Sequence, residues 1–170
     1  VGSFYSKRGD NIIGFLGIHD IDLLRWFGGE VVSVYAEAGA FVFSEHGPES
    51  LDTAMILVRF DSGAIGYVHS SWALPDSVPY RATSTFEVIG KKGTALIDAF
   101  DQSVRIASDS GYEIPNAWDI SQAFRAQALH FVECVRGRET PRITGYDGLK
   151  ALEVANAALI SAREKRPVNL

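Results

Sequence analysis

The sequence contains a single cysteine, Cys134, among its 170 residues, so no disulfide can form within the chain. Chains without disulfides are the rule in reducing compartments, and we expect a cytoplasmic protein. No apolar run approaches the roughly 18 residues that a membrane-spanning helix needs. No signal segment with a charged start and an apolar centre opens the chain. These absences predict a protein with no membrane partner.

Positive charge is also scarce, because 16 Lys and Arg residues stand against 21 Asp and Glu residues, for a net charge of −5. A protein that binds nucleic acid usually carries a basic stripe, and this sequence has none. Hydrophobic residues make up 46% and charged residues 22%, as in ordinary globular domains. We therefore expect a folded domain with no nucleic-acid partner.

Several motifs of catalytic and cofactor sites are missing as well. The sequence has no Gly-x-Gly-x-x-Gly or phosphate-loop spacing, so it predicts no dinucleotide-binding fold within these residues. It has no Gly-x-Ser-x-Gly nucleophile motif. The histidines lie far apart, and Cys134 has no cysteine partner, so we expect no metal site. The four histidines are His19, His46, His69 and His130.

The periodicity that is present predicts a helix, then several strands, then two helices. Ile18, Ile21, Leu24 and Phe27 recur every three residues, which predicts an amphipathic helix that ends at Gly28. Segments rich in Val, Ile, Thr and aromatic residues follow, each bounded by turn residues. These expected strands are 31–42, 53–60, 64–74, 80–89, 94–97 and 103–107, after a short strand in 1–6. Helical spacing returns at 120–135 and 149–163.

This order predicts an α+β fold with an open, mainly antiparallel sheet, because short connections favour antiparallel neighbours. Helices are expected on one face of the sheet. Apolar and aromatic residues fall on both parities of the first long strand, with Val32 and Val34 on one and Tyr35 and Phe41 on the other. We therefore expect the second face to be covered as well, most simply by self-association.

His19 and Asp22 form the first candidate for chemistry. Their three-residue spacing places them on one side of the predicted helix. A histidine there can act as a general acid or base near neutral pH. The alternative interpretation is structural, with His19 bonded to Asp22, or with Asp20 and Asp22 favoured by the positive end of the helix. Spacing alone leaves both interpretations open.

Three segments together resemble the C-terminal domain of the Gfo/Idh/MocA oxidoreductases, over nearly the whole chain. They are GIHDIDLLRW at 17–26, which resembles a G-x-H-x-x-D motif, FEVIGKKGT at 86–94, and DGLKALE at 147–153, followed by residues 161–163 and 166–168. The chain starts at Val1, inside an expected strand and without an initiator Met. The resemblance implies that residues 1–170 are a single C-terminal domain and that an N-terminal Rossmann domain is absent from this chain.

The resemblance also implies a function. Members of this family transfer hydride between a carbinol carbon and NAD(H) or NADP(H), which the Rossmann domain binds. Their C-terminal domain supplies part of the substrate pocket and usually the oligomer interface. The implied partners are thus a sugar, cyclitol or related polyol substrate, the protein's own Rossmann domain, and further copies through the sheet face. The isolated domain is expected to bind no cofactor and to be inactive.

The family's catalytic histidine corresponds to His19, where it assists proton transfer or binds the reacting hydroxyl. Many members have an Asp four residues earlier, where this chain has Phe15, which accepts neither a proton nor a hydrogen bond. Phe15, Trp72 and Tyr80 are candidate substrate-binding residues, and an ordinary strand-loop role is the alternative for Trp72 and Tyr80. Asp22 is expected to brace the helix. The Phe15 departure favours a second hypothesis, a non-catalytic saccharide-binding or scaffolding module that keeps the fold.

Overall fold

A computed structural model describes residues 11–74, 84–98, 103–114 and 120–170 of the chain. Contacts divide the chain into two compact units. The first unit comprises Val1–Ala73 and Ile143–Leu170, and the second comprises Leu74–Arg142. The expected strand in 1–6 lies outside the described residues.

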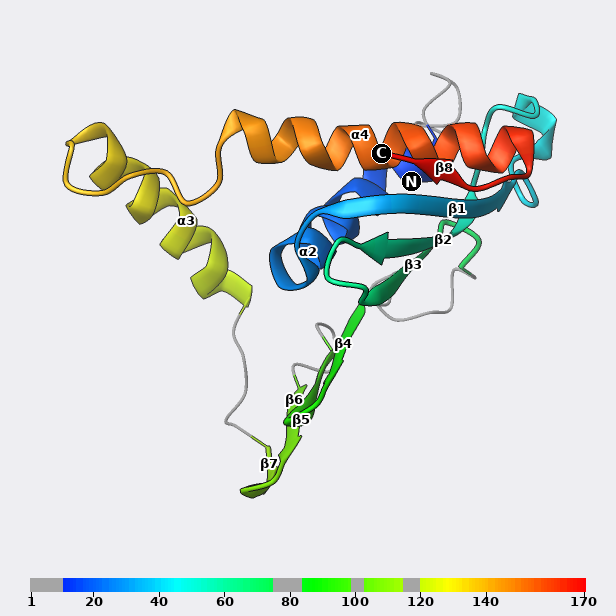
Figure 1. The fold of residues 1–170 in the computed structure, drawn as a ribbon. Coiled ribbons are helices and arrows are strands. Elements are labelled where there is room, and N and C mark those ends of the chain that lie inside the picture. Colours follow the sequence, from blue (N-terminus) through cyan, green and yellow to red (C-terminus); the bar gives the residue numbers. More distant parts are fainter. Residues whose placement is uncertain (1–10, 75–83, 99–102, 115–119) are drawn as a thin grey trace. The chain divides into compact units, whose positions relative to one another are not determined.

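The first unit is built on a four-stranded antiparallel sheet, which we call sheet A (Figure 1). Its strands lie in the order β3-β2-β1-β8. The last strand is two residues long and pairs with β1. The bounds are β1 Val31–Gly39, β2 Thr53–Phe60, β3 Ile65–Ser71 and β8 Val168–Asn169.

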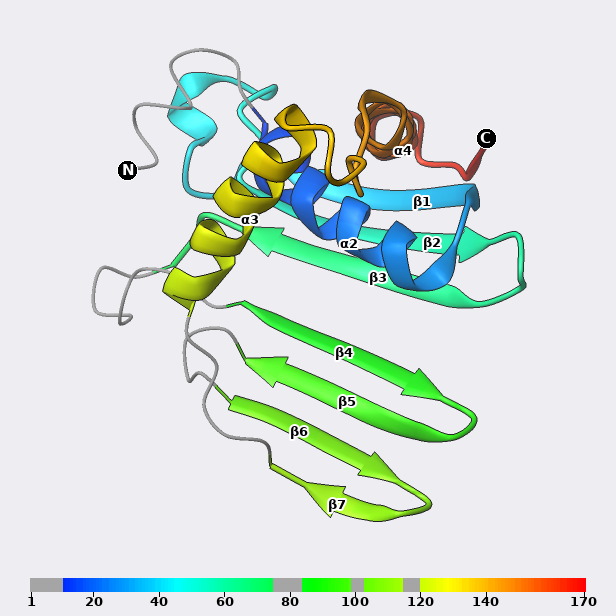
Figure 2. The ribbon, with the colours of Figure 1, turned by 90° about the vertical axis from the view of Figure 1, so that its left-hand side faces the viewer.

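Two long helices and a short π-helical segment cover one face of sheet A. They are η1 Ile13–Gly17, α2 Ile18–Gly28 and α4 Gly145–Glu164, and Figure 2 shows α2 beside the strands. A separate 3-10 turn, η2 Ser44–His46, lies in the loop after β1. Alternate strand residues such as Val34, Ile56 and Val68 form the core with Ile21 of α2 and the alanines of α4. The α+β prediction, with helices on one face of an antiparallel sheet, is confirmed.

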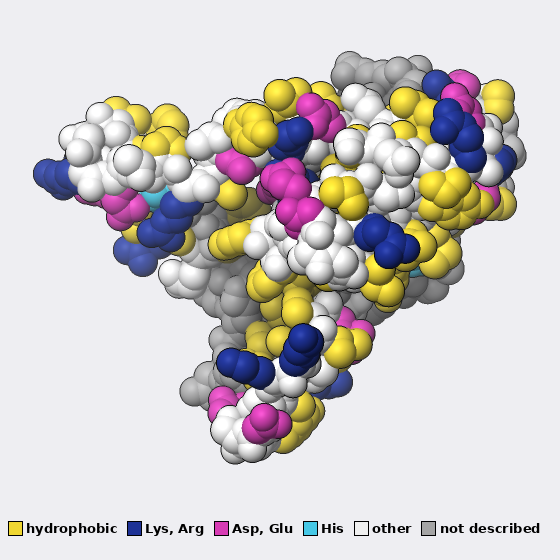
Figure 3. Space-filling model, viewed as in Figure 1, with side chains coloured by type: hydrophobic (Ala, Val, Ile, Leu, Met, Phe, Trp, Pro, Cys, Tyr) yellow, Lys and Arg dark blue, Asp and Glu magenta, His cyan; other side chains and the backbone are white. Residues whose placement is uncertain are grey.

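The buried face of α4 consists of small residues. Ala155 and Ala162 are buried, but Leu149 and Leu152, which recur with them at helical spacing, are exposed by 51% and 45%. Small residues face the sheet instead, which lets α4 approach β1 closely. Hydrophobic side chains therefore reach the surface along α4, between acidic and basic ones (Figure 3).

The second unit contains a four-stranded antiparallel meander, which we call sheet B, and one helix. Sheet B has the order β4-β5-β6-β7, and a two-residue turn at Lys91-Lys92 joins its first two strands (Figure 2). The helix follows its predicted bounds, but its apolar residues Phe124, Phe131 and Val135 are exposed. The elements are β4 Thr85–Gly90, β5 Gly93–Asp98, β6 Ser103–Ser108, β7 Gly111–Glu113 and α3 Ile120–Val135.

Candidate functional site

The candidate site lies where η1 passes into α2. Asn11 begins this segment, and its side-chain oxygen accepts a hydrogen bond from the Gly14 amide at 2.8 Å. Gly17 links the π-helical turn to α2 in ordinary right-handed helical geometry, so the helix continues without a break. π-helical turns of this kind occur frequently at functional sites. The junction places His19 and Asp20 in the first turn of α2.

His19 and Asp20 are both exposed, and Asp20 also reaches strand β3. The Ser70 hydroxyl donates a hydrogen bond to Asp20 Oδ2 at 3.4 Å, and Ser70 itself is 6% exposed. Desolvation of the carboxyl group raises the pKa of Asp20, while the Ser70 hydrogen bond and the charge of His19 lower it to a smaller extent. A histidine and a carboxyl group with a raised pKa therefore lie side by side.

An aromatic group forms at the same end of sheet A, just beyond the last residues of β1 and β3. The rings of Phe15 and Trp72 lie 5.9 Å apart with a tilt of 57°. Phe43 packs on Trp72 as well, and the centroids of these two rings lie 6.3 Å apart. Phe15 precedes His19 by four residues, which is about one helical turn. Two of the predicted substrate-binding residues, Phe15 and Trp72, are thus in contact, and Phe15 lies about one turn before the predicted catalytic residue.

A buried carboxylate holds the loop that carries Phe43. Asp52 is 0% exposed, and its Oδ2 accepts hydrogen bonds from the amides of Phe41, Val42 and Phe43 at 2.8, 2.7 and 2.9 Å. Its Oδ1 accepts a further bond from the Thr53 hydroxyl at 3.0 Å. The Asp52 carbonyl also accepts the Trp72 amide at 2.8 Å. One residue therefore positions both Phe43 and Trp72.

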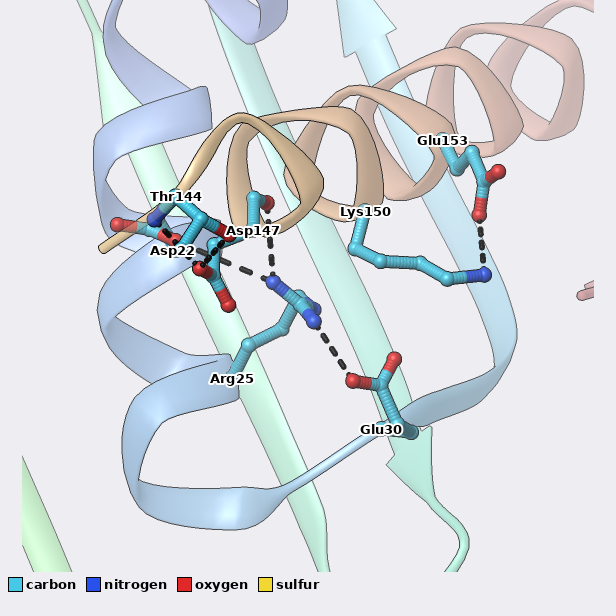
Figure 4. A network of polar contacts seen from close by, with 7 residues as sticks. All are labelled: Asp22, Arg25, Glu30, Thr144, Asp147, Lys150 and Glu153. Atoms are coloured by element: carbon cyan, nitrogen blue, oxygen red, sulfur yellow. Dashed lines mark hydrogen bonds and ion pairs between the residues drawn. The ribbon is translucent and has the colours of Figure 1, made fainter. Parts of the chain in front are cut away.

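A second polar network anchors α2 on the start of α4 (Figure 4). The guanidinium of Arg25 is buried and donates to Glu30 Oε1 at 2.7 Å and to the Asp147 carbonyl at 3.1 Å. Asp22 lies 4.0 Å from Arg25 Nη1, which fits the bracing role expected for Asp22. Thr144 donates its amide and hydroxyl to Asp147 Oδ2, both at 2.7 Å, and so caps α4.

Part of this arrangement could be predicted from the sequence. The predicted residues His19, Phe15 and Trp72 lie at one end of sheet A, while Tyr80 lies outside the described residues. Asp20 and Ser70 were not predicted as site residues. The signal for Ser70 was strand parity, because Val68 and Ser70 alternate with exposed neighbours and so face the helices.

The described residues contain no cluster of His, Cys, Asp and Glu suited to a metal ion. His130 and Cys134 of α3, which the sequence places one turn apart, have their own arrangement. His130 Nδ1 lies 2.7 Å from Glu139 Oε2, and Cys134 Sγ lies 3.6 Å from His130 Nε2.

In the part of the chain that the structure describes, no helix combines the length and the hydrophobicity of a membrane span.

Comparisons with known proteins agree with this fold. The scyllo-inositol 2-dehydrogenase (NAD(+)) of Bacillus subtilis is 33% identical over 98% of this chain and 49% of its own length. The myo-inositol 2-dehydrogenase of Thermotoga maritima is 30% identical over 98% of this chain and 51% of its own. The chain thus spans about half the length of these relatives.

A solved structure shows the same fold at lower identity. An oxidoreductase from Agrobacterium radiobacter, in complex with NAD+, L-tartaric acid and magnesium, matches with a TM-score of 0.79 and 24% identity. The match covers 93% of this chain and 48% of that one. The family model for the C-terminal alpha/beta domain of the oxidoreductase family matches residues 5–170. The chain therefore belongs to the Gfo/Idh/MocA oxidoreductase family, of which it forms the C-terminal alpha/beta domain.

Proposed function

We propose that this chain is the substrate-binding and assembly part of an NAD(P)-dependent oxidoreductase that acts on a sugar, cyclitol or related polyol. The observation that carries the proposal is the 33% identity, over 98% of the chain, to an NAD+-dependent inositol dehydrogenase. Other relatives by name oxidise the same class of compound, among them the D-apiose dehydrogenase of Paraburkholderia graminis at 31% identity.

The residues at the η1–α2 junction suit a polyol. Such a ligand presents hydroxyl groups at its rim and C–H groups on its faces, so it needs both polar and aromatic partners. His19 is the proposed catalytic residue, since an imidazole accepts or donates a hydroxyl proton near neutral pH. Phe15 and Trp72 offer aromatic surface to the C–H groups. Tyr80 stays in the proposal as a further binding residue, although it lies outside the described residues.

The described residues do not fit a dinucleotide. A dinucleotide fold needs parallel strands joined through a glycine-rich turn to a helix N-terminus. Every strand pair in sheets A and B is antiparallel. We therefore propose that NAD or NADP is held by a Rossmann domain in the half of the full-length protein that this chain does not span. A cofactor held there would supply the hydride chemistry, and His19 would hold or move the hydroxyl proton.

We propose that sheet A assembles with a second copy of the chain through its uncovered face. Four large hydrophobic residues of β2 and β3 point away from the helices and are exposed by 50–71%: Met55, Leu57, Ile65 and Tyr67. Leu57 and Tyr67 are direct cross-strand partners, so the apolar surface is continuous. A contiguous exposed patch of this kind favours a protein–protein contact. Leu57→Glu should lower the mass measured by sedimentation, and Ile89→Glu on sheet B should not.

Turnover tests the enzymatic proposal directly. The protein expressed from its complete gene is assayed against inositols, D-apiose and D-xylose, with NAD+ and with NADP+. We expect turnover with one of these polyols and its loss in His19→Ala. His130→Ala serves as the control, because His130 lies in α3 of the second unit and is paired with Glu139 there. Loss of turnover in both variants alike would contradict a specific role for His19.

A second function has one observation in its favour. Phe15 has an apolar side chain at the position where many family members carry an Asp, and it packs on Trp72 instead of offering a carboxylate. A saccharide-binding module without catalysis would tolerate this exchange. Binding of polyols without turnover, measured on the same full-length protein with either cofactor, would favour the module.

A further inference from the structure

Asp20 lies in the first turn of α2, yet helix capping does not explain its position. Acidic residues near the start of a helix usually interact with unpaired amides of the first turn. Here η1 runs into α2 through a helical Gly17, so Asp20 does not stand at a free helix start. Stabilisation of exposed helical amides therefore does not account for Asp20.

The contacts of Asp20 leave one oxygen available. Oδ2 accepts the Ser70 hydroxyl at 3.4 Å, and Ser70 is held in the buried face of β3. For Oδ1 the described residues provide no hydrogen-bond donor. Carboxylate oxygens are strong acceptors, and a hydrogen bond with an ionised partner is stronger than one between neutral groups. A carboxylate that is held through Oδ2, on a residue that remains exposed, can accept a hydrogen bond from a ligand hydroxyl at Oδ1.

We propose that Asp20 is a substrate-binding residue that accepts a hydrogen bond from a polyol hydroxyl, with Ser70 as the residue that positions its carboxylate. The inference rests on the proposed function, because it names a further ligand contact of the same site. His19 is adjacent in sequence, and Phe15 lies about one helical turn before it. The ligand hydroxyls would thus meet His19 and Asp20 together, while the aromatic pair contacts the C–H groups.

The proposal predicts that acid weakens binding. Desolvation raises the pKa of Asp20, so its carboxylate is lost in milder acid than that of an ordinary Asp. Once protonated, the group has lost the charge that makes it a strong acceptor. Binding therefore falls as the pH drops through the raised pKa of Asp20.

The charged neighbours of Asp20 on the described elements are few. His19 lowers the pKa of Asp20 from the same helix. The segment η1 has no ionisable side chain. On β3 the ionisable residues Tyr67 and His69 are exposed on the face opposite Ser70. On α4 the ionisable residues of Figure 4 have partners of their own: Asp147 accepts hydrogen bonds from Thr144, and Lys150 is paired with Glu153.

Calorimetric titration of the full-length protein with myo-inositol and scyllo-inositol, from acidic to neutral pH, tests this inference. Asp20→Asn should weaken binding at neutral pH about tenfold or more, which corresponds to about 1.4 kcal/mol. The affinity of Asp20→Asn should also depend less on pH, without the decrease in acid that the unaltered protein shows. Asp22→Asn is the matched control on the same helix and should leave affinity unchanged, because Asp22 only braces Arg25.

Ser70→Ala identifies the group that titrates. The Ser70 hydrogen bond lowers the pKa of Asp20, so its removal should move the acidic fall in affinity to higher pH. The titration of Ser70→Ala tests the role of Asp20 even if Asp20→Asn does not fold. An unchanged pH course in Ser70→Ala, or unchanged affinity in a folded Asp20→Asn, would overturn the inference. Absence of polyol binding by the unaltered protein would instead contradict the proposed function.

Discussion

The two sheets are built from similar alternating sequences, yet they bury very different amounts of side chain. In sheet A, Ile56, Val58 and Val68 are 1–3% exposed because α2 and α4 cover them. In the second unit, none of the described residues from 84 to 142 is fully buried. Alternation therefore determines which residues share a face of the sheet, and burial depends on the element that covers that face.

The difference also explains where the candidate site lies. Ser70 and Asp52 are hydrogen-bonded polar residues held in buried positions, and both belong to the first unit. A buried polar group is costly unless its hydrogen bonds are satisfied, and it is held firmly once they are. The covered sheet thus provides the rigid support that a binding site needs, and the described part of sheet B provides no comparable buried group.

The largest expected effect comes from a matched pair of isoleucines. Ile56→Ala removes a side chain that is 1% exposed and should lower the free energy of unfolding by about 2–5 kcal/mol. Ile106→Ala, in the middle of sheet B, should cost less than half as much, because that side chain is only half-buried. Urea unfolding followed by circular dichroism measures both losses. Equal losses would contradict the contrast between the two sheets.

A matched pair of aspartates gives the next effect. Asp52→Ala leaves the amides of residues 41–43 without their acceptor inside the fold, and we expect a loss of about 3 kcal/mol. Asp109→Ala, in the exposed turn between β6 and β7, should change stability by no more than about 0.5 kcal/mol. The same urea titration reports both. A small effect at Asp52 would mean that water replaces the carboxylate at those amides.

Much of the fold could be predicted from the sequence, since periodicity and turn residues act locally. The strand at 53–60 and the helix at 120–135 were predicted with the observed bounds. The pairing of β8 with β1 could not be predicted, because a two-residue strand has no periodicity of its own. Helical spacing in 149–163 does not reveal which apolar residues of α4 are buried: Leu149 and Leu152 are exposed, since close packing on β1 favours alanine over leucine.

The candidate site was less predictable than the fold. His19 stands in a recognisable motif, and Trp72 directly follows a strand, so both could be named. The contact of Asp20 with Ser70 joins residues 50 positions apart, and the carboxylate of Asp52 reaches amides 9 to 11 positions before it. Such contacts depend on the register of β1 against β2 and β3, which local spacing does not reveal.

A pair of helical glycines tests how tightly the first unit is packed. A Cβ on Gly28 would lie 2.4 Å from the buried ring of Phe60, so Gly28→Ala should cost about 1–3 kcal/mol. Gly148, in the first turn of α4, has no atom within 4 Å of such a Cβ. Gly148→Ala should therefore stabilise the helix by up to about 1 kcal/mol. Thermal unfolding that shows the same sign for both variants would contradict this packing.

The smallest effect concerns acid and the cap of α4. Hydrogen bonds from the hydroxyl and amide of Thr144 lower the pKa of Asp147. The pKa of Asp147 is lower in the folded chain than in the unfolded chain. The cap therefore contributes its full stabilisation at pH values above the unfolded pKa, and this stabilisation is lost as the pH falls through the folded pKa. Thr144→Ala should move the Asp147 midpoint upward in an NMR titration of its carboxyl carbon, and Thr140→Ala should leave it in place. An unmoved midpoint in Thr144→Ala would show that the backbone amide of residue 144 alone holds the Asp147 carboxylate. The helix end that Arg25 contacts through the Asp147 carbonyl would then keep its structure without the Thr144 hydroxyl.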